Sequence, residues 1–396
     1  MSVIEHWLLP EGIEEVLPEQ AWRLEQVRRE LLDVYRSWGY ELVIPPMIEF
    51  LESLLTGSGN DLDLQTFKLI DQLSGRMMGV RADMTPQAAR IDAHQLRREG
   101  PARLCYLGTV LHTRPDGFAG SRSPLQVGAE LYGHSGLESD LEIFELMLET
   151  LAVTGIAQVH VDLGHVGIFR GLARAAGLHA DQECELFDAL QRKAAADIEA
   201  LLAALDLREA QRRSLAALAT LHGGDDVLDR ARGMLGGDDS VAQALDELSA
   251  MAGAVGRRWP DLPLHFDLAE LRGYAYQTGV VFAAFTPGCG QEIARGGRYD
   301  KIGEIFGRAR PATGFSADLR TLIALSGRRD EPMRAAILAP ADDDPALGEA
   351  IRALRARGET VIRALPGAQV PEDEVRWDRE LVKEVERWVV RESGQK

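Results

Sequence analysis

The sequence predicts an α+β protein, in which strands and helices occupy separate stretches of the chain. Two apolar, strand-like runs at 104–111 and 125–133 are joined by a long loop punctuated with Gly and Pro, which is typical of a β-hairpin. Residues 166–258 are instead rich in Ala, Leu, Arg and Glu and predict several consecutive helices. A hydrophobic content of 45% over 396 residues is enough for a sizeable core and argues against an intrinsically disordered chain.

The N-terminal part is expected to alternate between helix and short strands. Apolar residues at helical spacing predict a helix over 18–38. The run 40–44 predicts a strand that two prolines end, because proline cannot continue a central ladder. Short strands joined by a Ser-Gly turn are expected between 67 and 82, and a helix with proline in its first turn over 86–98.

The loop of the predicted hairpin, residues 112–124, carries Arg114 and Arg122 among its glycines and prolines. We therefore expect a mobile, basic tip. A helix is predicted over 137–154 and a strand over 159–163.

The helical stretch that follows is interpreted largely as an insertion, because strand patterns resume directly after it. The expected strands are 264–268, 279–284 and 291–294. Gly296 and Gly297 are expected to form a turn, and Gly314-Phe315 to lead into a helix that ends at residue 325.

The end of the chain, residues 331–396, predicts a small α/β unit separate from a core over 1–325. Its expected elements are a strand over 335–339, a helix over 345–357, a strand over 360–365 and a final helix from about Asp378.

The composition argues against several classes of protein. The net charge of −18 disfavours broad, non-specific binding of nucleic acid, because neutralising phosphates requires surplus Lys and Arg. Cys105, Cys184 and Cys289 are far apart, so we expect neither a disulfide framework nor a structural metal site. The sequence has no secretory signal and no apolar run long enough to span a membrane, so we expect a cytoplasmic protein that does not contact membranes and uses no cofactor.

Several polar residues are candidates for a binding site, and each also has a purely structural interpretation. Gln126 and Glu130, four residues apart on a predicted strand, face the same side, either toward a ligand or toward solvent. Asp83 and Thr85 precede a proline and are also good helix caps. Arg272 has acidic neighbours with which it could form a salt bridge.

Four blocks acquire meaning from their order. They are Gly-Tyr-Glu-Leu-Val-Ile-Pro-Pro at 39–46, Val-Arg-Ala-Asp-Met-Thr at 80–85, the hairpin from Tyr-Leu-Gly at 106 to Gln-Val-Gly-Ala-Glu-Leu-Tyr-Gly at 126–133, and Leu-Arg-Gly-Tyr-Ala-Tyr-Gln-Thr-Gly at 271–279 with Gly-Gly-Arg-Tyr-Asp at 296–300 and Pro-Ala-Thr-Gly-Phe at 311–315. Together they resemble the histidyl-tRNA synthetases, a class II aminoacyl-tRNA synthetase family, over about residues 7–325. The resemblance implies an antiparallel sheet flanked by helices, with a helical insertion at about 166–258 and a first motif that forms dimers.

The ATP-binding positions of that family are changed in this chain. The family's second motif begins Phe-Arg-x-Glu, where this chain has Leu111-His112-Thr113. Its third motif ends Gly-Leu-Glu-Arg-Leu, where Arg320 takes the Glu position and Thr321 the Arg position. Such arginines bind the α-phosphate and neutralise developing charge, and losing one donor of this kind typically costs about 2.7–4 kcal/mol. The resemblance therefore implies a protein without useful aminoacylation activity and without catalytic residues.

The amino-acid pocket of the family is largely retained. The resemblance implies that Asp83 and Thr85 hold an amino group and that Arg272 contacts a carboxylate. Glu130, beside Gln126, would accept a hydrogen bond from an imidazole N–H. A tyrosine that contacts the imidazole in the family is Gln277 here, and Tyr276 is its nearest substitute. The histidine pocket implied in this way consists of Asp83, Thr85, Gln126, Glu130, Arg272 and Tyr276.

A synthetase-like core that keeps the histidine pocket, loses the ATP arginines and carries a reduced anticodon-binding domain resembles the regulatory subunits of ATP phosphoribosyltransferase. The resemblance implies a non-catalytic subunit in the first step of histidine biosynthesis. This subunit would be required for the activity of a short-form catalytic subunit and would mediate feedback inhibition by histidine.

The implied partners are that catalytic subunit in a hetero-octamer, a second copy bound through the first motif, and histidine as effector. No tRNA is expected, because the acidic runs 342–344 and 372–374 would repel phosphates. The hairpin tip at 116–123 is our candidate for a segment that orders when histidine binds. Two alternatives stay open: an active histidyl-tRNA synthetase or other amino-acid ligase, and a histidine-sensing module with a different partner.

Overall fold

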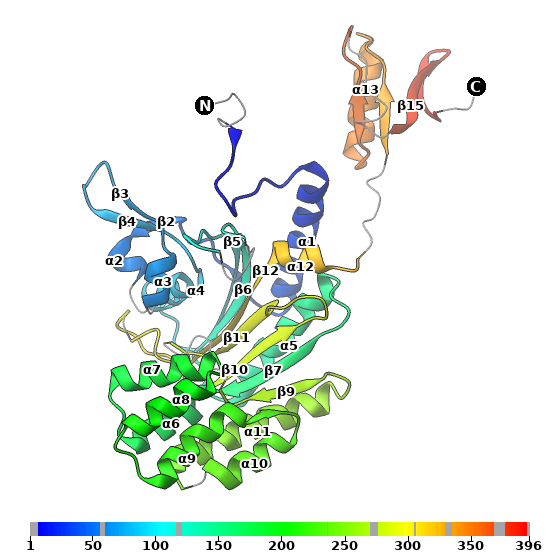
Figure 1. Ribbon diagram of the computed structural model, residues 1–396. Coiled ribbons are helices and arrows are strands. Elements are labelled where there is room, and N and C mark those ends of the chain that lie inside the picture. Colours follow the sequence, from blue (N-terminus) through cyan, green and yellow to red (C-terminus); the bar gives the residue numbers. More distant parts are fainter. Residues whose placement is uncertain are drawn as a thin grey trace. The chain divides into compact units, whose positions relative to one another are not determined.

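A computed structural model of the chain divides into two compact units, residues 1–328 and 329–396 (Figure 1). The structure describes residues 7–55, 60–115, 121–235, 237–269, 276–304, 306–328, 335–367 and 377–393. Among these residues, no helix combines the length and the apolar character that crossing a bilayer requires.

The first unit is built on one large sheet, which contains nine strands within the described residues. In spatial order they are β1 (Glu41–Leu42), β5 (Ala102–Thr109), β6 (Leu125–Tyr132), β12 (Ala312–Asp318), β11 (Ala294–Arg298), β10 (Val280–Phe285), β7 (His160–His165), β9 (Leu264–Asp267) and β8 (His222–Gly223). Pairing is antiparallel from β5 through β7, while β1–β5 and β7–β9 are parallel. The α+β class and the hairpin β5–β6 are thus confirmed.

Helices α1 (Pro18–Ser37), α5 (Leu137–Val153) and α12 (Leu319–Leu325) pack against this sheet. Helix α1 buries Val27, Leu31 and Tyr35, which lie four residues apart and so share one face. The Tyr35 ring meets Phe315 of β12 edge to face at 6.4 Å between centroids. These contacts place the middle strands of the sheet inside the main hydrophobic core.

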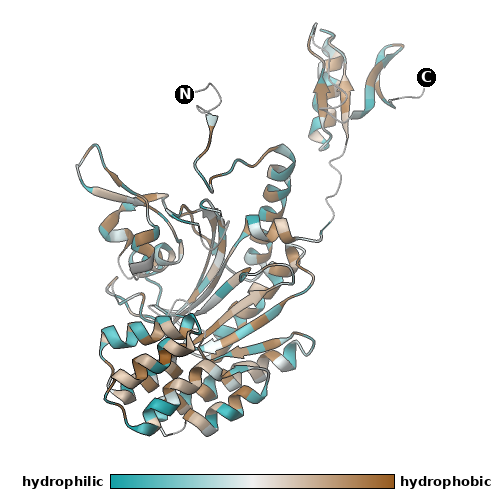
Figure 2. Cartoon of the chain, viewed as in Figure 1, coloured by the Kyte–Doolittle hydropathy of each residue, from teal (hydrophilic) through white to brown (hydrophobic). Residues whose placement is uncertain are grey.

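The stretch between β7 and β9 forms a helical layer, as its composition predicts (Figure 1). Its elements are α6 (Val166–Ala176), α7 (Ala180–Gln191), α8 (Ala195–Ala204), α9 (Glu209–Ala217), a 3₁₀ turn (Leu218–Thr220), α10 (Asp226–Leu235) and α11 (Asp239–Arg258). Apolar and hydrophilic residues alternate along these helices (Figure 2), which is the pattern of helices that bury one face.

A second, small sheet lies beside the hairpin, in the order β2 (Ile48–Phe50), β4 (Met77–Val80), β3 (Lys68–Ile70). It is accompanied by α2 (Leu51–Leu54), α3 (Asn60–Gln65), α4 (Thr85–Arg90) and a π-helical turn over Ile91–Leu96. The strand expected over 40–44 is confined to β1, since the two prolines follow closely.

The predicted turn at Gly296 and Gly297 is wrong, because both glycines lie inside β11. A Cβ atom on Gly296 would lie 2.4 Å from the Gly314 carbonyl oxygen and 2.5 Å from the Phe282 ring. Glycine is needed there for close packing within the sheet rather than for a reversal of the chain.

The second unit contains a four-stranded sheet in the order β14 (Val361–Arg363), β13 (Ala336–Ala339), β15 (Trp377–Glu384), β16 (Arg387–Glu392), with helix α13 (Pro345–Ala356). The final helix predicted from Asp378 is wrong, because this segment forms the hairpin β15–β16. Its many charged residues obscured a period of two, in which Leu381 is buried between more exposed neighbours.

Candidate functional site

Glu130 of β6 is the centre of a buried polar pocket in the first unit. Its side chain is 1% exposed, and its carboxylate accepts hydrogen bonds from the Tyr106 hydroxyl (2.8 Å) and from the Tyr299 hydroxyl. Gly314 lies opposite in the neighbouring strand β12. A Cβ atom at that position would lie 1.5 Å from Oε2 of Glu130, so only glycine leaves room for the carboxylate.

The surroundings of Glu130 make its charge costly. Burial raises the pKa of the Glu130 carboxyl to about 8, although the hydrogen bonds from Tyr299 and Tyr106 favour the charged form. The nearby charge of Asp83 raises this pKa further. A ligand that donates a hydrogen bond to this carboxyl would therefore stabilise its ionised form.

Asp83 and Thr85 lie just before and at the start of α4, at the mouth of the same pocket. Asp83 Oδ1 accepts hydrogen bonds from the Thr85 backbone N–H (2.9 Å) and from Gln126 Nε2 (2.7 Å). Thr85 Oγ1 lies 3.0 Å from the Tyr106 hydroxyl, which links the pair to Glu130. The capping interpretation and the binding interpretation are therefore compatible, because Oδ2 of Asp83 makes no hydrogen bond within the described part of the chain.

Four of the six residues predicted for the histidine site line this pocket in the structure. They are Asp83, Thr85, Glu130 and Tyr276. Gln126 does not line it but holds Asp83 in place and accepts from the Met84 backbone N–H at 2.9 Å. Arg272 lies outside the described residues.

Among the residues that were not predicted as site residues, Tyr299, Gln277 and Arg295 line the pocket, and Tyr106 donates a hydrogen bond to Glu130. The two tyrosines are fully buried, and in the sequence they are indistinguishable from packed core residues. Gln277 is 5% exposed, and its Oε1 has no hydrogen-bond partner in the part of the chain that the structure describes. Arg295 of β11 brings positive charge to the pocket rim and forms an ion pair with Glu292 at 3.4 Å.

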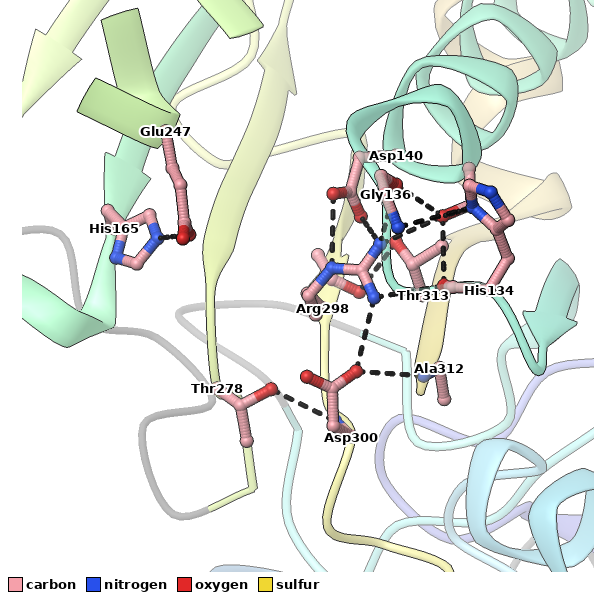
Figure 3. A network of polar contacts seen from close by, with 12 residues as sticks. His134, Gly136, Asp140, His165, Glu247, Thr278, Arg298, Asp300, Ala312 and Thr313 are labelled. Atoms are coloured by element: carbon pink, nitrogen blue, oxygen red, sulfur yellow. Dashed lines mark hydrogen bonds and ion pairs between the residues drawn. The ribbon is translucent and has the colours of Figure 1, made fainter. Parts of the chain in front are cut away.

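A separate ion-pair network fixes β11, the strand that leads to Tyr299. Figure 3 shows Arg298 between Asp140 of α5 and Asp300. Arg298 contacts Asp140 at 3.0 Å and Asp300 at 3.2 Å, and it also donates to the His134 backbone carbonyl. Arg298 and Asp140 are both nearly inaccessible to solvent, so this network anchors the pocket strand rigidly to α5.

The positions that would bind ATP in a synthetase have other contacts here. His112 is buried, and its Nε2 lies 2.9 Å from the Ala82 carbonyl oxygen. Thr321 Oγ1 donates at 2.7 Å to Asp318, the residue that caps the N-terminus of α12. Arg320 donates to the Glu14 backbone carbonyl at 3.4 Å.

Known proteins are similar to this chain over both of its units. The family model for histidyl-tRNA synthetase matches residues 12–322, and a model described as the ATP phosphoribosyltransferase subunit HisZ C-terminal domain matches residues 334–391. An ATP phosphoribosyltransferase regulatory subunit from Thioalkalivibrio sulfidiphilus is 65% identical over 93% of both chains. Another from Alkalilimnicola ehrlichii is 60% identical over 92% of this chain and 91% of the relative.

Solved structures show the same kinship. A protein from Bacillus halodurans, described as an ATP phosphoribosyltransferase regulatory subunit/histidyl-tRNA synthetase, aligns with a TM-score of 0.82 at 28% identity over 93% of this chain and 95% of that one. Histidyl-tRNA synthetase from Nostoc shares the fold, with a TM-score of 0.75 at 21% identity over 95% and 91% of the two chains. The prediction of a regulatory rather than a catalytic subunit is thereby confirmed. The chain belongs to the family of ATP phosphoribosyltransferase regulatory subunits, whose core here has the fold of the histidyl-tRNA synthetases.

Proposed function

We propose that the Glu130 pocket binds free histidine and that its occupancy sets the activity of the catalytic subunit of ATP phosphoribosyltransferase. The observation that carries this proposal is the convergence of two acids, Glu130 and Asp83, on one pocket that also contains aromatic side chains. Histidine carries donors at both ends, an ammonium and an imidazole N–H, and so matches two separated acceptors.

Each part of histidine has a counterpart in the pocket. The ammonium would donate to Asp83, and the imidazole N–H would donate to Glu130, each as a charge-assisted hydrogen bond. The imidazole ring would pack beside Tyr276 and Tyr299, whose own centroids are 6.4 Å apart. Arg295 at the rim would attract the carboxylate, together with Arg272, the carboxylate contact that the family resemblance implies.

Feedback inhibition requires that histidine bind one state of the assembly more tightly than the other. The segment at 116–123 remains our candidate for the element that responds. Residues 116–120 lie outside the described residues. Beside them, Arg122 donates to the backbone carbonyls of His112 (3.1 Å) and Glu11 (3.0 Å), so the base of the tip is tied to the N-terminal segment.

The catalytic subunit is the partner that membership of this family implies. We further propose self-association through the first motif. Strand β1 lies at the edge of the large sheet, and apolar side chains around it are exposed, with Ile44 81% exposed and Leu42 45% exposed. Unpaired edges with apolar residues favour pairing with another chain. We expect a cytoplasmic hetero-octamer in which two copies meet at this edge.

Calorimetric titration of the purified chain with histidine tests the proposal. We expect saturable binding of histidine and none of alanine, because alanine has no imidazole to reach Glu130. The variant Glu130→Gln should weaken histidine binding by about 10- to 100-fold, the usual effect of losing a hydrogen bond to a charged group. In a reconstituted complex, the histidine concentration for half-inhibition should shift by the same factor.

The matched control is Glu145→Gln, which removes an acid from the exposed face of α5 and should leave histidine binding unchanged. Equal affinity for histidine in the Glu130→Gln variant and the parent would refute this pocket as the site.

A further inference from the structure

A second pocket lies in the groove between the facing sides of α6 and α11. Arg170 and Arg174 of α6 line it on one side, and Ser240 and Glu247 of α11 line it on the other. Thr278, just before β10, and Lys301, in the loop after β11, complete the lining. Four separate elements of the chain therefore contribute to one concave surface, which neither family membership nor the histidine pocket explains.

Two glycines of α6 lie where this helix packs against α11, and Gly167 also lines the groove. A Cβ atom at Gly171 would lie 2.7 Å from Val241 Cγ2, and one at Gly167 would lie 3.3 Å from Ala244 Cβ. The two helices therefore approach each other closely at these positions. Helix α6 begins at this place, with its Gly167 N–H bonded to Nδ1 of the capping residue His165 at 3.0 Å.

The groove collects positive charge in a chain whose net charge is −18. Arg170, Arg174 and Lys301 are its cations. Among the residues that the structure describes, Arg174 and Lys301 make no hydrogen bond or ion pair with an acid. Most other arginines of the helical layer pair with a carboxylate, as Arg192 at the end of α7 does with Asp188 at 3.0 Å. Asp238 is near enough for the charge of Arg174 to help lower its pKa, but within the described part of the chain neither cation has a carboxylate in direct contact. Two such cations at one pocket suit an anionic ligand.

The groove also contains an acid, Glu247, whose partner is a histidine rather than one of the groove's cations. Glu247 lies 3.0 Å from Nε2 of His165 (Figure 3), and this hydrogen bond lowers the pKa of its carboxyl. Glu247 therefore stays ionised and can accept hydrogen bonds from hydroxyl groups. The hydroxyls of Ser240 and Thr278 add neutral polar groups. The groove thus offers cations for a phosphate and an acceptor for a sugar.

We propose that this groove binds a phosphorylated sugar, either free or as part of a nucleotide. Arg174 and Lys301 hold the phosphate, with Arg170 beside them, and Glu247 accepts from sugar hydroxyls.

The groove and the histidine pocket share a wall, so that occupancy of one is sensed by the other. Gln277 lines the Glu130 pocket, whereas the next residue, Thr278, lines the groove. Arg170 Nη1 donates to the Gln277 backbone carbonyl at 2.5 Å, and Thr278 Oγ1 accepts from the Asp300 N–H at 2.9 Å. This second part of the inference rests on the proposed function of the pocket.

Calorimetric titration of the full chain with inorganic phosphate, ribose 5-phosphate and AMP, at matched ionic strength, tests the groove. We expect saturable binding of ribose 5-phosphate or AMP that is tighter than that of inorganic phosphate. Whichever of the two binds more tightly identifies the source of the sugar phosphate. The double variant Arg174→Gln/Lys301→Gln should weaken this binding at least tenfold, and Glu247→Gln should reduce the preference over inorganic phosphate.

The control variant is Arg257→Gln, which removes an exposed cation from the far end of α11 and should change nothing. No saturable binding of ribose 5-phosphate or AMP, or equal affinity in the double variant, overturns the site. Histidine titrated with and without ribose 5-phosphate tests the shared wall, and an unchanged histidine affinity overturns that part. If histidine does not bind at all, the proposed function fails while the sugar-phosphate titrations still decide the groove.

Discussion

Glu130 and Asp92 are equally buried acids of the first unit, but they are neutralised differently. Asp92 is 2% exposed, and both its oxygens accept from Arg310 Nη1 at 2.8 and 3.0 Å. Glu130 is 1% exposed and, among the described residues, is contacted by tyrosine hydroxyls rather than by a cation. Asp92 is thus an acid paired with a cation inside the fold, whereas Glu130 is a buried acid without a cationic partner among the described residues.

The largest expected effect comes from breaking the completed pair. Asp92→Ala leaves the Arg310 guanidinium buried without its partner, and we expect the free energy of unfolding to fall by about 3–5 kcal/mol. Urea denaturation measures this. The control Asp33→Ala removes an acid from an exposed pair with Arg36 and should cost less than about 1 kcal/mol. Similar losses in the two variants would show that the buried pair is not special.

The space around Glu130 is tested by Gly314→Ala. The added methyl group would collide with the Glu130 carboxylate, so we expect at least a tenfold loss of histidine affinity and a destabilisation of about 1–3 kcal/mol. Calorimetry and thermal unfolding measure the two effects. Gly256→Ala is the control, because nothing lies within 4 Å of its added Cβ on helix α11. That variant should keep full affinity and be slightly more stable.

The raised pKa of Glu130 predicts a pH dependence of opposite sign to that of a salt-bridged acid. The folded protein holds a proton on Glu130 up to pH about 8, whereas the unfolded chain loses it near 4.5. The contribution of Glu130 to the free energy of unfolding should therefore be largest below pH 4.5. It should fall by on the order of a few kcal/mol as the pH rises toward 8. Comparing denaturation of the parent and Glu130→Gln across this range isolates the effect. Identical pH profiles of the two proteins would contradict it.

Histidine binding should draw the proton from Glu130. Below pH 8 the imidazole N–H favours the ionised carboxylate, so binding should release up to one proton per chain. Titrations in buffers with different ionisation enthalpies measure the release. The effect should vanish in Glu130→Gln, and a parent protein that binds histidine without releasing protons at pH 7 would argue against contact with this carboxyl.

The smallest expected signal is the exchange of labelled pyrophosphate into ATP in the presence of histidine. His112 and Thr321 occupy the positions of the synthetase arginines, and their side chains form hydrogen bonds with Ala82 and Asp318 of this chain. We therefore expect no exchange above background. A genuine histidyl-tRNA synthetase provides the positive control. Clear exchange would restore the ligase alternative.

The sequence predicted the elements whose patterns are strong and local. Helix α1, the β5–β6 hairpin and the helical layer follow from apolar spacing and composition. The hairpin β15–β16 was mistaken for a helix, because charged residues dominate it and its buried face is short. Gly296 and Gly297 were mistaken for a turn, because the reason for glycine there is the approach of β10, with the Phe282 ring near Gly296 and the Val280 carbonyl oxygen near Gly297, which no local pattern reveals.

In the pocket too, residues that depend on contacts between distant segments could not be predicted. Glu130 and Asp83 were identified through a family resemblance, and the structure brings both to one pocket. Tyr106 and Tyr299 were not identified, since their function depends on a carboxylate contributed by a third strand. The groove between α6 and α11 could not be predicted from the sequence either, because its arginines and its lysine come from segments more than a hundred residues apart.

The helical layer leaves the large sheet after β7 and returns at β9, and these two strands are neighbours. The entire layer is thus a detour between adjacent strands, and its loss or replacement would leave the order of the remaining central strands intact. Changes within the layer, and in the groove with it, therefore need not alter the order of the strands around Glu130.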